Sequence, residues 1–216
     1  YFISVLSFLM IFLSANNSYS VDSYLKKVNY KKVYQWNIDC IKLLLFIVYF
    51  YSGLAKINSD WLIEAQPLKI WLTSNYDLPI IGNTLMQQEW FHYMMSWSGM
   101  FYDLFIPFLL IYNRTRIYAF LLVIFFHLFT AVLFPIGMFP YIMIVASIIF
   151  FEAETHKKII KKLGVIFNLS AIKKVIKENK YFTYKNEKIA LFIVTIFFIF
   201  QITFPFRYVF YPGELF

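Results

Sequence analysis

The sequence has few of the residues from which soluble proteins build disulfides, metal centres and charged surfaces. Its single cysteine, Cys40, excludes an internal disulfide and a cysteine-based metal site. Three histidines, scattered along the chain, do not indicate a metal site either. Charged residues make up only 15% of the chain, against about 25% in a typical soluble domain. The sequence also contains no glycine-rich phosphate loop, nucleophile elbow or internal repeat.

Apolar residues are abundant instead, at 61% of the chain, which is typical of a membrane protein. The 20 Lys and Arg residues are segregated, because sixteen of them lie in three connections between apolar stretches, at 26–32, 114–116 and 157–188. Cytoplasmic loops of multi-pass membrane proteins retain Lys and Arg in this way. The sequence therefore predicts a polytopic membrane protein in the bilayer. We expect no nucleic-acid partner, since the net charge of +8 lies in loops that face anionic lipid.

Six apolar stretches predict an all-α fold, a bundle of about six membrane-spanning helices. Several stretches are shorter than the roughly twenty residues that a straight crossing needs, but flanking aromatic and lysine side chains can make up the difference. The chain begins with Tyr1 inside the first stretch, so we expect that span to be truncated and the chain to be a fragment. The predicted spans are residues 1–14, 41–57, 91–112, 116–134, 138–151 and 189–206.

The alternation of spans assigns each connection to one side of the membrane. The lysine-rich segment 152–188 is predicted to be cytoplasmic, and its interleaved lysines and apolar residues favour an amphipathic helix at the membrane surface. The acidic connection 58–89, which contains tryptophans, is predicted to be extracytoplasmic. Within it, apolar residues at helical spacing between residues 62 and 72 indicate a helix in the membrane interface.

Ionisable residues inside membrane spans are costly and are therefore candidates for a functional site. Asp103 must pair within the bundle, and a structural partner such as a Tyr or an Arg is the alternative to a functional role. His127 lies in the middle of a span, where a hydrogen bond between helices explains it as well as catalysis does. Lys42 lies near the inner end of its span, and we expect its ammonium to reach the membrane surface.

Lys56 differs because it lies at the outer end of a long apolar helix, beside small residues that leave room for a ligand. By the predicted orientation it is near the extracytoplasmic face. An ammonium that is partly withdrawn from water loses solvation, and this favours the neutral amine, which can act as a base. A lysine that only reaches for the membrane surface is the alternative.

Two segments carry distinctive motifs. The first, FIVYFYSGLAKINSDW, runs from Phe46 to Trp61 and contains Lys56. The second, FHLFTAVLFPIGMFPY, runs from Phe126 to Tyr141 and contains His127. Both resemble segments of the vitamin K-dependent gamma-glutamyl carboxylases, members of the HTTM (horizontally transferred transmembrane) domain family. Further matches in the same order cover nearly the whole chain, and we identify it as a bacterial-type member of that family; they are Ser20-Val-Asp22, Trp36-Asn37, and Gln201 with Pro205.

The resemblance implies that Lys56 is the base that deprotonates vitamin K hydroquinone or a related quinol. In that family, oxygen addition then gives an epoxide-forming alkoxide, which removes a γ proton from a peptidyl glutamate so that the carbanion captures carbon dioxide. The implied co-substrates are O2 and CO2, without a metal, and the implied partners are the quinol and a glutamate-containing peptide or protein. The pocket residues expected around Lys56 are His127, Asp103 and Tyr141, with Asp60 and Trp61 at the outer rim.

The sequence also departs from that family's pattern. A second catalytic residue of the animal enzymes, a histidine in an Asn-His pair, would fall two residues before Tyr1, and their second lysine is Ala55 here. Their C-terminal domain, which holds substrate propeptides, is absent from this sequence. Quinol epoxidation is compatible with the residues present, whereas glutamate carboxylation does not follow from them. The alternative is a non-catalytic HTTM membrane protein that binds, matures or gives immunity against a peptide or toxin, and a transporter is the third hypothesis.

Overall fold

The computed structural model describes residues 2–17, 20–21, 25, 28–30, 33–73, 82–166, 178–180 and 187–206. These residues are helical apart from turns and one pair of three-residue strands. The chain divides into two compact units, one formed by residues 45–150 and the other by residues 1–44 together with 151–216. The helical fold class is therefore confirmed for the described residues, and the two short strands are an addition to it.

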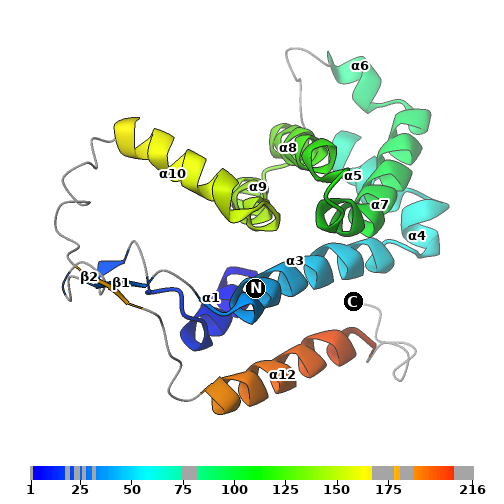
Figure 1. Cartoon of the computed structure of the whole chain (residues 1–216). Coiled ribbons are helices and arrows are strands. Elements are labelled where there is room, and N and C mark those ends of the chain that lie inside the picture. The colour runs from blue at the N-terminus through cyan, green and yellow to red at the C-terminus, as the bar shows by residue number, and fades with distance from the viewer. Residues whose placement is uncertain are drawn as a thin grey trace. The chain divides into compact units, whose positions relative to one another are not determined.

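Four helices are long and apolar enough to cross a membrane. They are α3 (Gln35–Ala55), α7 (Glu89–Ile111), α8 (Arg116–Leu133) and α12 (Glu187–Thr203), the last continued by the 3-10 turn η2 (Phe204–Phe206) (Figure 1). The other two predicted spans are shorter apolar helices: α1 (Phe2–Phe12), and α9 (Phe139–Ser147) with its 3-10 extension η1 (Ile148–Phe150). Four of the six predicted spans thus have a spanning length in the described residues.

Helix α3 begins at Gln35, earlier than residue 41 where the apolar stretch begins. The Gln35 side chain donates a hydrogen bond to Asp39 Oδ1 at 3.0 Å, one turn further along the helix. Side chains four residues apart support a helix in this way. The polar start of α3 was missed because the prediction followed hydropathy alone.

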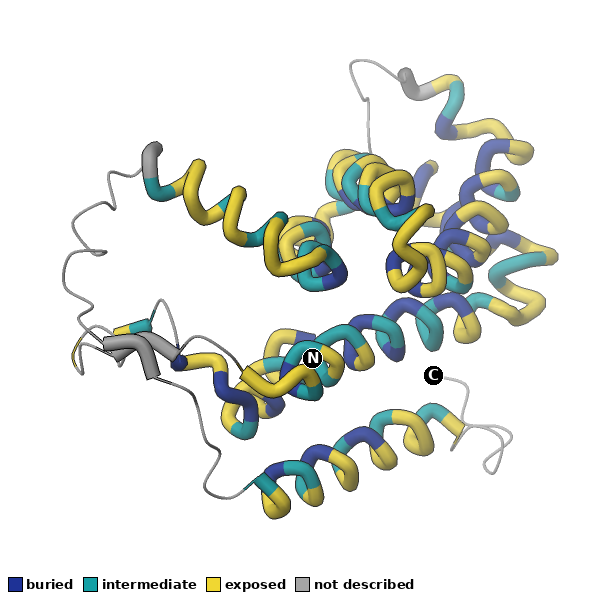
Figure 2. Tube along the Cα trace, in the orientation of Figure 1, coloured by how far each residue is buried: buried dark blue, intermediate teal, exposed yellow. Residues whose placement is uncertain are grey.

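Exposed residues recur along the long helices (Figure 2), and many of them have large apolar side chains. Phe105 on α7, Phe125 on α8 and Phe192 on α12 are 56%, 65% and 66% exposed. Water would oppose such a surface over contiguous turns, because soluble proteins rarely expose large apolar patches. Lipid accepts it, so the exposed faces support contact with the bilayer.

In the unit formed by the two ends of the chain, α1 packs against α12, with the Phe8 and Phe197 rings 5.6 Å apart. Strand β1 (Val28–Tyr30) pairs in parallel with β2 (Glu178–Lys180), which lies beside it in Figure 1. Helix α10 (Ala153–Ile166) occupies the beginning of the segment predicted as a basic amphipathic helix, and β2 lies in its later part. The two strands have only three residues each and are far apart in the sequence, so no local sequence pattern predicts them.

Several basic residues used to predict the orientation lie outside the described residues. They are Lys26, Lys27, Lys31, Lys32, Lys173, Lys174, Lys177, Lys185 and Arg207.

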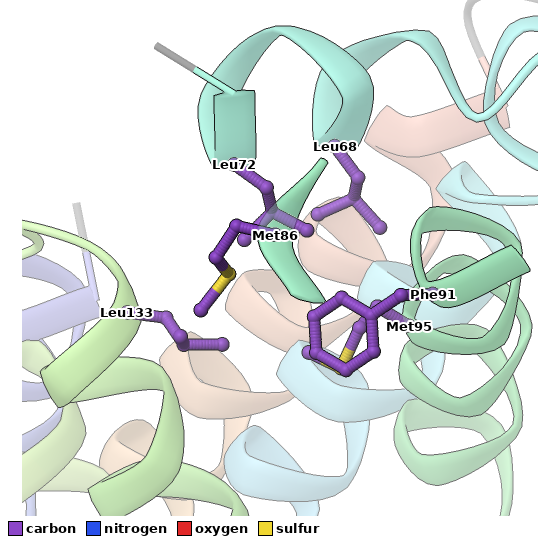
Figure 3. Packing of buried hydrophobic residues seen from close by; sticks show 6 residues of the cluster. All are labelled: Leu68, Leu72, Met86, Phe91, Met95 and Leu133. Atoms are coloured by element: carbon purple, nitrogen blue, oxygen red, sulfur yellow. The ribbon is translucent and has the colours of Figure 1, made fainter. Parts of the chain in front are cut away.

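In the unit of residues 45–150, three short helices follow α3: α4 (Ser59–Leu62), α5 (Gln66–Thr73) and α6 (Gly82–Met86). Leu68 and Leu72 of α5 point toward Met86, Phe91, Met95 and Leu133, from α6, α7 and α8 (Figure 3). The structure differs in two respects from the single helix predicted for residues 62–72, whose place in the membrane interface stays a prediction. The chain turns at Ala65, with φ of +48°, and the buried leucines pack against protein rather than lipid.

Helices α3 and α7 approach each other closely at Gly53. A Cβ atom at this position would lie 2.7 Å from Leu104 Cγ and 2.8 Å from the Leu104 backbone nitrogen. The backbone nitrogen cannot move away without moving α7. Gly53 therefore permits the helix contact that brings the polar residues of α3 and α7 together.

We predict that Gly53→Ala forces α3 and α7 apart and lowers the free energy of unfolding by about 2 kcal/mol, within the range for overpacked sites. Gly99→Ala on α7 is the matched control, because a Cβ atom there meets nothing within 4 Å. That change should be neutral or stabilising by up to about 1 kcal/mol from helix propensity. Unfolding of both variants in detergent micelles measures this, and equal destabilisation would contradict the close approach.

Candidate functional site

Lys56 is the first residue after α3, and a compact turn fixes its position. The Lys56 backbone N–H donates to Gly53 O at 3.1 Å. The Asn58 side chain then serves both neighbouring helices, because its Nδ2 donates to Ala55 O at 2.8 Å and its Oδ1 accepts from Trp61 N at 2.8 Å. Asparagine is a favoured helix N-cap for this reason.

The Lys56 side chain folds back along α3 toward Asp103 of α7. Its Nζ lies 2.5 Å from Asp103 Oδ2, 2.8 Å from Ser52 Oγ and 3.1 Å from Ser52 O. Ser52 Oγ in turn donates to the same Asp103 oxygen at 2.8 Å. An ammonium has three N–H bonds to donate, so these three contacts use all of them.

Two features stabilise the positive charge of Lys56, and one opposes it. The first is the Asp103 carboxylate, the negative charge nearest to Nζ. The second is the helix dipole of α3, whose C-terminal carbonyl groups favour a cation. Partial burial opposes the charge, since the side chains of Lys56 and Asp103 are only 18% and 9% exposed. The prediction of a neutral amine at Lys56 did not take the Asp103 carboxylate into account. The alternative, a lysine that reaches for the membrane surface, did not include the inward turn of Nζ.

Trp61 closes the site beside Lys56, whose Nζ is 5.3 Å from the centre of the indole ring. Hydrogen bonds between α4 and α7 hold this tryptophan. Trp61 Nε1 donates to Ser96 O at 3.0 Å, Ser96 Oγ donates to Trp61 O, and Trp97 Nε1 donates to Leu62 O at 3.1 Å. A cation over an indole face is a favourable contact, so Trp61 is a wall of the site.

Outside the spans, an ion pair connects α5 to the start of α7. Lys69 Nζ lies 3.0 Å from Glu89 Oε1. The hydrogen bond with Glu89 raises the pKa of Lys69 above its ordinary value. Glu89 is exposed and Lys69 is half-buried, and neither side chain lines the cavity.

A cavity of about 510 Å³ lies next to Lys56 and Asp103. This volume is in the range of pockets for drug-sized ligands, about 300–1,000 Å³. Its lining is mainly apolar, with contributions from α3, α5, α7, α8 and α9. The apolar lining includes Leu68, Trp71, Met95, Phe126, Phe134, Phe139 and Met143, and Gly99 leaves additional room.

His127 also lines this cavity, and its Nε2 lies 2.9 Å from the hydroxyl oxygen of Tyr49. It thus makes a hydrogen bond between helices, as expected for a histidine in the middle of a span. Tyr49 and His127 are 2% and 4% exposed. The cavity therefore has two main polar groups, the pair of Tyr49 with His127 and the cluster of Lys56, Ser52 and Asp103. Thr130 also lines it, and its hydroxyl donates to His127 O at 3.1 Å.

The structure brings four of the predicted residues to one cavity: Lys56, Asp103, His127 and Trp61 line it. Asp60 and Tyr141 are exposed and are not among the lining residues. The α4 turn directs Trp61 toward α7 and leaves its neighbour Asp60 at the surface. The partner of Asp103 is Lys56, not the Tyr or Arg that the sequence suggested.

Two functional side chains, Tyr49 and Ser52, were not selected from the sequence. Both lie on the Lys56 face of α3, at a spacing of seven and four residues from it, which places side chains on one side of a helix. This periodicity was available in the sequence. It was not used because a tyrosine and a serine in an apolar span are common and carry no charge.

Within the described residues, no three His, Cys, Asp or Glu side chains lie close enough together to hold a metal ion.

The helices and the buried ion pair define the class of the chain as a multi-pass membrane protein with a polar site beside an apolar cavity. The chain belongs to the HTTM domain family, which matches it over residues 1–155, and this is the domain shared with vitamin K-dependent gamma-carboxylase. The match includes every cavity-lining residue named above. No solved structure matches the chain.

We predict strong thermodynamic coupling between Lys56 and Asp103. Lys56→Met or Asp103→Leu alone should cost about 3 kcal/mol, because each leaves a buried charge without its partner. The double variant should be close to the wild type, since replacing both members of a buried pair by apolar residues is often neutral. A double-mutant cycle of unfolding free energies measures this coupling.

The pair of Lys69 and Glu89, in which the carboxylate is exposed to solvent, is the control for that cycle, and its coupling should not exceed about 1 kcal/mol. Additive effects of the Lys56 and Asp103 substitutions would show that the two charges do not depend on each other.

Proposed function

We propose that this HTTM-domain protein is a membrane enzyme in which Lys56 removes a proton from a lipid-soluble quinol, with Asp103 as the residue that accepts the proton of Lys56. The reaction we propose is quinol epoxidation, in which the quinol and O2 give the quinone epoxide and one molecule of water. The observation that carries this proposal is the ion pair of Lys56 and Asp103 on the wall of an apolar cavity.

The cavity suits a substrate that arrives from the bilayer. Its walls are aromatic and aliphatic side chains, which favour an apolar ring over water. Hydrogen-bonding groups occur at only a few points, and this combination is typical of small-molecule sites. A water-poor cavity also keeps a strongly basic reaction intermediate from taking its proton from solvent.

Lys56 can act as a base only after it loses a proton, because the nitrogen of an ammonium has no lone pair with which to accept one. Asp103 Oδ2, at 2.5 Å, is the nearest acceptor. Transfer along this hydrogen bond converts the ion pair into a neutral amine and a neutral carboxylic acid. An apolar ligand that displaces water from the cavity favours this transfer, since charges become more costly when water is excluded.

The neutral Lys56 amine then accepts a proton from the hydroxyl group of the bound quinol and becomes an ammonium again. Ser52 fixes both partners during this exchange, because its hydroxyl contacts Lys56 Nζ and Asp103 Oδ2. The proton that Asp103 holds can return to water through the exposed edge of the Lys56 side chain. By the distribution of Lys and Arg, this edge faces the extracytoplasmic side.

Carboxylation of a peptidyl glutamate, with CO2 as co-substrate, has weaker support. Lys56 is the only Lys or Arg among the described residues that line the cavity. A glutamate carboxylate would have to displace Asp103 from it, which leaves a buried carboxylate unpaired. The cavity therefore fits an uncharged ring better than a charged peptide side chain.

We predict that Lys56→Met lowers epoxide formation by about a hundredfold to ten-thousandfold, the usual loss when a positioned base is removed. Asp103→Asn should cause a loss of the same order, because an amide cannot take the proton of Lys56. Lys56→Arg should be as inactive as Lys56→Met, since a guanidinium keeps its proton and cannot act as the base. The measurement is quinone epoxide produced from quinol and O2 by the complete protein in lipid vesicles.

Lys42→Met is the matched control, because it removes a lysine from the same helix, at a position that does not line the cavity. Its activity should equal that of the wild type. Added small amines should partly restore activity to Lys56→Ala by entering the vacated space. Epoxide formation that survives Lys56→Met would rule out the base, and absence of epoxide with every quinol tested would favour the non-catalytic HTTM alternative.

A further inference from the structure

A second polar pair lies in the same cavity, formed by Tyr49 of α3 and His127 of α8. Both side chains are almost fully buried. They are partners for each other, and the hydroxyl groups of Ser147 and Tyr102 lie near that of Tyr49 in a region that is mainly aromatic. The rings of Tyr102 and Phe139 lie 6.1 and 6.2 Å from the imidazole, each edge-on to it. A polar pair with this enclosure can bind a ligand atom only from the cavity side.

The spacing of the two polar groups follows from α3. Tyr49 and Ser52 are three residues apart, about 4.5 Å along the helix axis at 1.5 Å per residue. Lys56 Nζ folds back to Ser52, so the two polar groups are anchored on α3 about one helical turn apart. This is close to the width of a six-membered ring that carries an oxygen atom at each end.

The chemistry of the pair suits an oxygen that is either a hydroxyl or a carbonyl. If Tyr49 donates to His127 Nε2, the imidazole proton is on Nδ1; if Nε2 donates instead, the Tyr49 hydroxyl proton is available. Each arrangement offers a donor and can accept in return. A charged group would not suit this place, because no opposite charge lies beside it among the described lining residues.

We infer that Tyr49 and His127 bind the second oxygen of the ligand, so that the cavity selects a ring with oxygens at opposite ends and presents only one of them to Lys56. This inference rests on the proposed function, because it needs the first oxygen to lie against Lys56 and Asp103. Tyr49 and His127 are then positioning residues that determine which end of the ring reacts.

The apolar walls support this orientation. Phe126 lines the cavity and stacks on Tyr102, with ring centres 3.7 Å apart. Phe134, Phe139 and Met143 complete the lining beside His127. These residues supply contact area. Thr130 also lines the cavity, but its hydroxyl proton is donated to His127 O at 3.1 Å, so the two polar pairs are the main groups that fix the direction of the ring.

The test measures binding without turnover, using a 1,4-naphthohydroquinone and its mono-O-methyl ether without oxygen. Quenching of intrinsic tryptophan fluorescence reports binding to the complete protein in vesicles, since Trp61 and Trp71 line the cavity. The wild type should bind the diol about tenfold more tightly than the ether, because the ether leaves one buried polar group unsatisfied. In Tyr49→Phe/His127→Leu this preference should disappear, because the methoxy group then faces an apolar wall.

Replacing both members of a hydrogen-bonded pair by apolar groups of similar shape is often nearly neutral for folding, which keeps the double variant measurable. Tyr93→Phe is the matched control, since it removes another phenol hydroxyl of the same unit, one that contacts Lys69 and does not line the cavity, and it should retain the tenfold preference. A preference that persists in the double variant overturns the inference and leaves the Lys56 proposal standing. If the wild type binds neither compound, both proposals fail.

Discussion

The ion pair between Lys56 and Asp103 is the interaction on which the site depends. A single charge inside an apolar helix bundle is unstable, because its solvation is lost and nothing replaces it. Two opposite charges on neighbouring helices solve this problem for each other, but only if the helices lie close together. Gly53 supplies that closeness against Leu104, and Ser52 completes the hydrogen bonds of both charged groups.

In the function that we propose, the same arrangement lets a structural pair also act as a proton-transfer site. Lys56 and Asp103 are joined by one short hydrogen bond at the wall of a cavity, and their side chains retain little contact with water. Whether the proton is on nitrogen or oxygen then depends on what fills the cavity. An apolar occupant shifts the balance toward the neutral pair, whereas water stabilises the ion pair. Binding and base formation are linked through a single bond.

Part of this site could be predicted from the sequence. The cost of ionisable groups in apolar spans identified Lys56, Asp103 and His127 one by one, and all three line one cavity. Their pairing could not be predicted, because Lys56 and Asp103 are far apart in the sequence and meet only where α3 and α7 pack at Gly53. The placement of Asp60 and Tyr141 at the surface likewise depends on the turns after α3 and α8, which hydropathy does not specify.

The membrane spans likewise have features that the sequence predicts and features that depend on tertiary contacts. Hydropathy located the apolar core of each long helix, but it missed the polar first turns of α3, where Gln35 and Asp39 interact. It also treated residues 62–72 as one helix on the membrane surface. The turn at Ala65 and the packing of Leu68 and Leu72 against Phe91, Met95 and Leu133 are tertiary effects. Apolar residues at helical spacing indicate a buried face without indicating whether lipid or protein covers it.

The most direct test of the account is an infrared difference spectrum of the complete protein in vesicles, recorded as a quinol binds in the absence of oxygen. If the proton of Lys56 moves to Asp103 when the cavity fills, a C=O stretching band of a protonated carboxylic acid should appear. It should shift with carbon-13 labelling of aspartate and be absent from Asp103→Asn. Quinol binding without this band, or with a band that persists in Asp103→Asn, would contradict the central claim that the pair exchanges its proton.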